Sequence, residues 1–184
     1  MRVLFLGDSN FNAGTDNGSH IGKLTSDMRG GFPFVNSGVP GRTVGGGTAG
    51  IDAEIDSANM SGQLTHVVVM LGTNDYAWLA QGQTVQVVAG HIQTIATKIA
   101  NKGLLPLIVL PPPNSVQAWR DYEAALGFEI AWRNTTGAYR IVNPWEGMTS
   151  PQWAAWNTDG THLTVAGRQV VATAIAEALA AGSR

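Results

Sequence analysis

A serine near the amino terminus and an Asp-x-x-His motif near the carboxyl terminus are the features of this 184-residue chain most suited to chemistry. Ser9 closely follows an apolar run that ends at Leu6, and Asp159-Gly-Thr-His162 stands just ahead of the last helical pattern. A hydroxyl, an imidazole and a carboxylate are the groups that acyl transfer uses as nucleophile, general base and orienting acid. The two segments can serve this chemistry only if the fold brings them together.

Asp159 distinguishes His162 from the other histidines of the chain. At this spacing a carboxylate can reach the imidazole Nδ1–H and leave Nε2 facing outward. His20, His66 and His91 lie in segments with helix, loop or strand patterns, and we interpret them as structural or solvated residues. In isolation, Asp159 is typical of a turn and His162 of a helix start. Together with Ser9, the catalytic interpretation is favoured.

Donors for a developing oxyanion are also present. The backbone N–H of Ser9 can serve, and so can that of Gly41, where the missing Cβ lets a substrate approach. Asn74, within Gly72-Thr-Asn-Asp75, offers a side-chain amide. The structural alternatives are a turn glycine at position 41 and a capping asparagine at position 74. Because both residues follow strand-like runs, we expect them at adjacent strand ends.

Strand-length apolar runs alternate with segments of helical spacing over most of the chain. Three of the runs are nearly continuous, which is typical of parallel strands covered on both faces. Helical stripes lie within 85–99 and 119–130 and from about 164 onward, whereas the glycine-rich stretch 45–50 is predicted to be a loop. This alternation predicts right-handed βαβ units around a parallel sheet. The predicted strands are Val3–Leu6, Phe32–Val35, His66–Leu71, Leu104–Leu110 and Arg140–Val142.

The candidate residues share one edge of this predicted sheet. Ser9, Gly41, Asn74 and Pro111–Pro113 each follow a predicted strand. In open α/β sheets, ligands bind beyond the carboxyl ends of the strands. The sequence therefore places its reactive side chains where such folds carry their sites.

Four short blocks in this order closely resemble the SGNH hydrolase superfamily, the GDSL-like esterases and lipases. They are Gly7-Asp8-Ser9, Asn36-Ser-Gly-Val-Pro-Gly41-Arg-Thr43, Gly72-Thr-Asn-Asp75 and Asp159-Gly-Thr-His162. The resemblance implies a flavodoxin-like, three-layer α/β/α sandwich with a five-stranded parallel sheet. It also implies that residues 1–184 form a single domain of this type.

By the same resemblance, Ser9 is the nucleophile, His162 the general base and then acid, and Asp159 the residue that orients His162. The backbone N–H groups of Ser9 and Gly41 and the side chain of Asn74 form the implied oxyanion hole. No metal or other cofactor is implied. Asn10 stands where the family most often has leucine, which bears on the lining of the substrate pocket.

The implied reaction is hydrolysis of carboxylic esters through an acyl-serine intermediate. No long apolar lid segment is visible, which favours short-acyl or acetyl esters, on small molecules or on carbohydrates. A lipid-directed acylhydrolase or thioesterase of the same mechanism is the alternative. Trp78, Trp145, Trp153 and Trp156 are candidate substrate contacts, because aromatic rings stack on sugars or line acyl pockets. They equally suit the anchoring of a long loop on the core.

Composition narrows the remaining function classes. A net charge of −2 without a basic cluster argues against nucleic-acid binding, and no apolar run is long enough to span a membrane. The chain lacks a signal-peptide pattern, so the default expectation is a cytoplasmic location, while the oligomeric state is left open. With no cysteine, thiolate chemistry is excluded.

Two rival functions remain open at this stage. A metal-dependent phosphoesterase could use Asp8, Asp75, Asp159 and His162 as metal ligands, although no Asp-x-His or His-x-His motif is present. A non-catalytic carbohydrate-binding module would keep the fold and the tryptophans, but would not explain why every catalytic position is occupied. The dinucleotide-like pattern Gly45-x-Gly-x-x-Gly50 does not directly follow a strand, and we attribute it to chance.

Overall fold

The computed structural model describes residues 1–12, 20–148 and 155–181. Five parallel strands form one sheet in the order β2-β1-β3-β4-β5. This order confirms the predicted flavodoxin-like α/β architecture and its five-stranded parallel sheet. The strands are β1 (Val3–Gly7), β2 (Phe34–Gly38), β3 (His66–Met70), β4 (Leu105–Val109) and β5 (Arg140–Val142).

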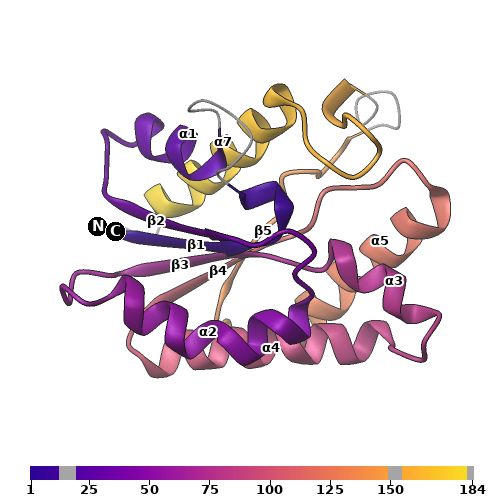
Figure 1. The fold of residues 1–184 in the computed structure, drawn as a ribbon, viewed down its shortest axis with the longest axis horizontal. Coiled ribbons are helices and arrows are strands. Elements are labelled where there is room, and N and C mark those ends of the chain that lie inside the picture. Colours follow the sequence, from indigo (N-terminus) through magenta and orange to yellow (C-terminus); the bar gives the residue numbers. More distant parts are fainter. Residues whose placement is uncertain (13–19, 149–154, 182–184) are drawn as a thin grey trace.

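Helices cover both faces of the sheet, which gives the expected three layers (Figure 1). On one face α1 (Ile21–Met28) packs beside α7 (Val165–Ala181). On the other lie α2 (Val44–Ala58), α4 (Val85–Asn101) and α5 (Gln117–Arg133). No helix of the described residues is long and apolar enough to cross a lipid bilayer. Short helical turns follow the strands: η1 (Ser9–Phe11), η3 (Thr73–Asp75) and α3 (Tyr76–Leu79).

Side chains of the central strands alternate between two apolar cores. In β1, Leu4 and Leu6 join the core beneath α2 and α4, while Val3 and Phe5 join the core beneath α1 and α7. All five residues of β1 are buried. Burying each large apolar side chain contributes roughly 1.5–3 kcal/mol. Because both faces are covered, the central strands carry continuous apolar runs, as the sequence predicted.

The strand order reverses direction at β1. The chain passes from β1 to β2 on one side and then returns to β3 on the other. The crevice at such a switch point is where ligands bind in open α/β sheets. Ser9 follows β1 and Asn74 follows β3, so the topology places both beside this crevice.

The predicted loop at 45–50 is wrong, because these residues form the first two turns of α2. Thr43 caps the helix by accepting a hydrogen bond from the backbone N–H of Gly46 (3.2 Å). A stripe at helical spacing was present in the sequence, but a glycine occupies one of its positions. Burial of this stripe against the sheet outweighs the low helix propensity of glycine. The buried positions are Val44, Gly47, Ile51, Ile55 and Ala58.

The second strand also differs from its prediction over Phe32–Val35. β2 begins at Phe34 because Pro33 has no N–H to donate to a sheet ladder. It continues to Gly38, which pairs in register with Gly7 of β1. A Cβ at Gly38 would overlap the backbone of Phe11, so glycine here allows η1 to lie directly on the strand. The other predicted strands differ from the structure by at most one residue at either end.

Candidate active site

Ser9 lies at the first position of η1, two residues beyond the end of β1. Asp8 caps this turn: its Oδ1 accepts a hydrogen bond from the backbone N–H of Asn10 (2.9 Å). Phe11 holds the far end of the turn in the core, with its ring edge-on to Phe5 at a centroid distance of 5.7 Å. The turn is therefore fixed at both ends, while the hydroxyl of Ser9 remains partly exposed.

The Asp159–His162 loop is folded tightly on itself. Oδ1 of Asp159 accepts hydrogen bonds from the backbone N–H groups of Thr161 (3.0 Å) and His162 (2.8 Å). The backbone N–H of Thr158 donates to the carbonyl of His162 (2.8 Å), which closes the loop. These bonds leave the other oxygen of Asp159, Oδ2, directed at the imidazole.

Asp159, His162 and Ser9 form one hydrogen-bonded chain. Oδ2 of Asp159 lies 2.6 Å from Nδ1 of His162, and Nε2 of His162 lies 3.0 Å from Oγ of Ser9. Hydrogen bonds from the side chain and backbone of His162 lower the pKa of Asp159 to about 2. The carboxylate is therefore ionised at neutral pH and accepts the Nδ1 proton, which leaves Nε2 as the basic nitrogen facing Ser9.

The segment that follows β4 supports this loop from behind. Backbone N–H of Ser115 donates to the carbonyl of Gly160 (3.1 Å), and Nδ2 of Asn114 donates to Oγ1 of Thr161 (3.0 Å). Glu123 of α5, which is buried, accepts from the backbone N–H of Asn114 (2.9 Å). Burial raises the pKa of Glu123 to about 8. Residues 111–113, which the sequence places after the fourth strand, are thus followed directly by the residues that support the Asp159–His162 loop.

Gly41 and Asn74 follow β2 and β3, the two strands that flank β1 in the sheet. Nδ2 of Asn74 donates to the carbonyl of Arg42 (3.0 Å), which orients the amide and leaves its second N–H for another acceptor. Gly41 is exposed and has a φ of 73°, a conformation that favours glycine. Arg42 is itself held by Glu54 (Nη2 to Oε1, 2.9 Å) and by the carbonyl of Ser37 (3.0 Å).

Two further carboxyl groups, Asp8 and Asp75, are buried near the same strand ends. Burial raises the pKa of each to about 6. Oδ2 of Asp75 accepts from the backbone N–H of Val44 (2.9 Å) and so ties η3 to the start of α2. The described part of the chain contains no cluster of three histidine or acidic side chains that could hold a metal ion. Asp8 and Asp75 serve as caps of backbone N–H groups instead.

A cavity of about 350 Å³ opens beside Ser9 and His162. Polar groups make up much of its wall. One of them, Arg168 in the first turns of α7, donates from Nε (3.2 Å) and Nη2 (3.0 Å) to the carbonyl of Leu163. The sequence singled out Ser9, Asn10 and His162 among the lining residues. It missed the rest, because nothing in their local pattern shows that they meet at one cavity. The remaining lining residues are Asn12, Pro40, Thr158 and Leu163.

Three of the tryptophans predicted as substrate contacts, Trp78, Trp145 and Trp156, lie outside the lining of this cavity. Trp78, in α3, is about half exposed. Nε1 of Trp145 donates to the backbone just after β4 (3.0 Å), and its ring packs against the core. Trp156 lies against Gly167 of α7, so closely that a Cβ at position 167 would overlap the backbone of Trp156. The Trp145 side chain therefore anchors its loop on the core, whereas Trp153 falls outside the described residues.

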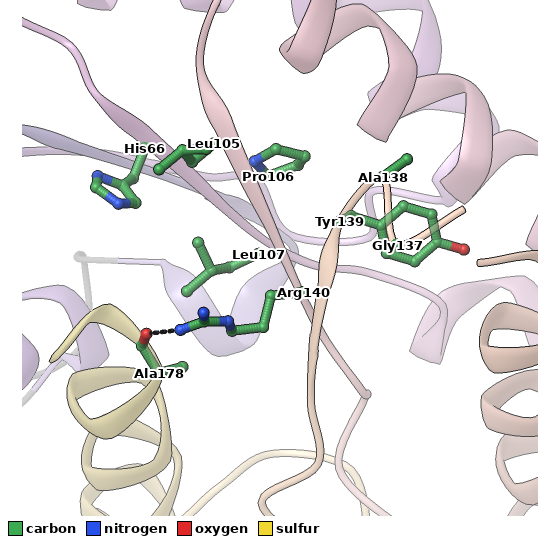
Figure 2. Close-up of a pocket in the computed structure, with 9 residues that line it drawn as sticks. All are labelled: His66, Leu105, Pro106, Leu107, Gly137, Ala138, Tyr139, Arg140 and Ala178. Atoms are coloured by element: carbon green, nitrogen blue, oxygen red, sulfur yellow. Dashed lines mark hydrogen bonds between the residues drawn. The ribbon is translucent and has the colours of Figure 1, made fainter. Parts of the chain in front are cut away.

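A second cavity, of about 410 Å³, lies at the amino-terminal ends of the strands (Figure 2). His66 and Leu105, the first residues of β3 and β4, line it together with Arg140 at the start of β5. The guanidinium of Arg140 donates to the carbonyl of Ala178 in the last turns of α7. Burial, followed by nearby positive charge, lowers the pKa of His66. None of the residues of the Ser9–His162–Asp159 chain lines this cavity.

Family comparison agrees with this geometry. The model of the GDSL-like Lipase/Acylhydrolase family matches residues 5–170. The chain belongs to this family and is a serine hydrolase of carboxylic esters. Among curated proteins, none matches the chain.

Solved structures share the fold over nearly the whole chain. The inhibitor-bound aryl esterase of M. smegmatis is 17% identical, with a TM-score of 0.80 and 98% of both chains covered. The acetyl xylan esterase AlAXEase is 16% identical, with a TM-score of 0.74 and coverage of 97% of this chain and 99% of that one. The psychrotrophic esterase EstA from Pseudoalteromonas sp. is 17% identical, with a TM-score of 0.74 and coverage of 97% and 96%. At these identities the likeness concerns the fold.

Proposed function

We propose that this protein hydrolyses short-acyl esters, acetyl esters above all, of small molecules or carbohydrates through an acyl-Ser9 intermediate. The observation that carries the proposal is the hydrogen-bonded chain from Asp159 through His162 to Ser9, with links of 2.6 and 3.0 Å. Both distances lie within the range in which a base can take a proton from a nucleophile and an acid can orient that base.

In the first step, Oγ of Ser9 attacks the ester carbonyl carbon while Nε2 of His162 takes the hydroxyl proton. The π electrons of the carbonyl move to its oxygen and give a tetrahedral anion. The N–H groups of Ser9 and Gly41 and the amide of Asn74 stabilise this anion. The hydrogen bond from Asn74 to the carbonyl of Arg42 supports this role, because it fixes the amide before substrate arrives.

In the second half of the reaction, the tetrahedral anion collapses and the bond to the alcohol oxygen breaks. His162 returns its proton to that oxygen, so a neutral alcohol leaves and an acyl-Ser9 ester remains. Water then attacks this ester while Nε2 of His162 takes a proton from it, and collapse returns the proton to Oγ of Ser9. The ionised Asp159 stabilises the imidazolium at both stages.

The cavity beside Ser9 supports the short-acyl assignment. Its volume of about 350 Å³ is at the low end for ligand pockets, and Asn10, Asn12, Thr158 and Arg168 supply polar wall. Such a lining suits a small acyl group on a hydroxylated or aromatic alcohol better than a long aliphatic chain. The structural relatives described as an acetyl xylan esterase and an aryl esterase agree with this choice. A lipid acylhydrolase or thioesterase of the same mechanism is the competing assignment.

A panel of p-nitrophenyl esters from acetate to palmitate tests the proposal on the wild type and on Ser9→Ala. We expect kcat/KM to be highest for acetate to butyrate and to fall steeply beyond. A preference for palmitate would replace the short-acyl assignment with the lipid one. If every aryl ester is inert, release of acetate from acetylated polysaccharide is the next measurement.

Two controls separate the serine mechanism from its rivals. A serine-directed phosphonate should label wild-type protein at Ser9, and labelling should persist in Ser57→Ala, which changes an exposed serine of α2. Loss of activity in a chelator, restored by added metal, would instead establish a metal-dependent hydrolase. Inertness towards all esters together with no phosphonate labelling would remove the esterase proposal.

A further inference from the structure

Asn10 links the two segments that carry the nucleophile and the base. Its side chain is only 6% exposed, and its Oδ1 accepts a hydrogen bond from the backbone N–H of Leu163 (3.1 Å). Asn10 is the covalent neighbour of Ser9, and Leu163 is the covalent neighbour of His162. One buried hydrogen bond therefore joins residues adjacent to both partners of the Ser9–His162 contact.

Asn10 also lies beside a buried carboxyl group, because its backbone N–H donates to Oδ1 of Asp8 (2.9 Å). Asp8 is 1% exposed, and the side chains of Asn10 and Thr73 lie close enough to its carboxyl group to lower its pKa against the raising effect of burial. An amide oxygen accepts and an amide nitrogen donates, so Oδ1 belongs against the N–H of Leu163. Turning the amide over would place Nδ2, a donor, against the N–H of Leu163, which is also a donor. The surroundings thus allow one orientation.

This link acts where the site is otherwise open. The side chains of His162 and Asp159 are 47% and 55% exposed, so neither is held by burial. The buried Asn10–Leu163 bond connects their loop to η1 beneath the catalytic chain. Misplacement of a catalytic group by about 1 Å can cost on the order of 100-fold in rate. The Asn10–Leu163 bond is thus one of the bonds that fix the position of this loop, and it is the one made by a neighbour of Ser9.

We propose that Asn10 is a positioning residue, which holds His162 at hydrogen-bonding distance from Ser9 through the Leu163 amide. The proposal rests on the proposed function, in which Ser9 and His162 exchange a proton. It also gives a physical reason for asparagine at a position where the family that the sequence resembles most often has leucine: leucine offers no acceptor to the buried N–H of Leu163.

Asn10→Leu is the direct test, measured with the best p-nitrophenyl ester. We expect kcat to fall about 10- to 100-fold with KM within about threefold of wild type, because positioning acts on the transition state. Asn10 also lines the cavity, so a raised KM with unchanged kcat would overturn the proposal and make Asn10 a substrate contact. A kcat within about threefold of wild type would overturn it as well.

Asn10→Asp gives a second test that also serves if Asn10→Leu folds poorly. It keeps an acceptor for Leu163 but adds a second carboxyl group beside the buried Asp8, whose Oδ1 accepts from the backbone N–H of residue 10 (2.9 Å). The two carboxyl groups, with Thr73 and His162 around them, are compatible while they share one proton. The ratio of its kcat to that of wild type should therefore be near one on the acid side and fall as pH rises. Equal, pH-independent losses in both variants would show a packing role instead.

Asn59→Leu is the matched control. Oδ1 of Asn59, at the end of α2, accepts from the backbone N–H of Leu64 (2.9 Å), which is the same kind of bond placed away from Ser9. This variant should lower Tm without changing kcat. Amide hydrogen exchange of Leu163 provides a readout that does not require ester turnover: it should be accelerated at least tenfold in Asn10→Leu and unchanged in Asn59→Leu. If wild type cleaves no ester, the proposed function fails, while unchanged exchange at Leu163 would refute the link itself.

Discussion

Nε2 of His162 lies 3.0 Å from Oγ of Ser9, although 153 positions separate the two residues in the chain. Ser9 reaches this point as the second residue beyond the buried strand β1, directly after the capping residue Asp8. His162 reaches it from a loop that leads into α7, which packs with α1 over the same sheet. The contact therefore depends on how α7 packs on the sheet. Four substitutions test the roles of the Ser9–His162 contact and of the residues around it.

Ser9→Ala should abolish turnover without unfolding the protein. Removing the nucleophile leaves only the oxyanion donors and substrate binding, so we expect kcat to fall by at least about 10³-fold. Ser9 is only partly buried, and Tm should stay close to that of wild type. Steady-state kinetics and thermal unfolding check both statements. Turnover within tenfold of wild type would exclude Ser9 as the nucleophile.

Asp159→Asn should reduce kcat by about 10²–10⁴-fold, because an amide can stabilise the wrong tautomer of His162 and carries no charge to offset the imidazolium. The loop should persist, since an Asn oxygen can still accept from the N–H groups of Thr161 and His162. The pKa of Asp159 is depressed to about 2, so its charge is present above that pH and lost only below it. Asp159 itself thus stays ionised from pH 5 to 9 in wild type, and a kcat of Asp159→Asn within tenfold of wild type would contradict the prediction.

Asn74→Ala should lower kcat by about 10²–10³-fold, the usual effect of removing one oxyanion donor. The amide donates to the carbonyl of Arg42, but Arg42 is held independently by Glu54, so the fold should survive. Circular dichroism and the kinetics of the same preparation provide the comparison. Asn101→Ala, at the exposed end of α4, is the control and should match wild type. An unchanged rate in Asn74→Ala would exclude this residue from the oxyanion hole.

Glu123→Gln should change the pH dependence of stability. The folded-state pKa of Glu123 is raised from an ordinary value of 4.5 to about 8 by burial, so the folded protein holds this proton over a range where the unfolded chain releases it. Stability must then fall as pH rises from about 4.5 to 8. Glutamine keeps the acceptor for the N–H of Asn114 but does not titrate.

Urea unfolding at pH 5 and pH 8 measures this effect. The free energy of unfolding of Glu123→Gln, relative to wild type, should increase between the two pH values by roughly 1–3 kcal/mol. Asp8 and Asp75, whose pKa values are also raised by burial, titrate in both proteins and cancel in the difference. A difference that does not grow with pH would show that Glu123 is ionised in the folded state throughout.

The amino-acid sequence by itself determined the alternation of strands and helices, the edge of the sheet that carries the reactive residues, and the choice of His162 among four histidines. These follow from local patterns: apolar runs that must be covered on both faces, and a carboxylate three positions before an imidazole. The glycines of 45–50 misled the prediction because helix propensity is local, whereas burial of Val44, Ile51 and Ile55 against the sheet is not.

Only the tertiary structure decided which polar groups meet. It made Asn10, which lines the cavity, also the partner of the Leu163 amide, placed Trp145 as a loop anchor, and added Arg168 to the cavity wall. Each of these contacts joins segments far apart in the chain, and the distance between them is set by how α7 and the strand ends pack. Residue types limit the chemistry that a chain can perform, but the packing of distant segments decides which atoms come within reach of one another.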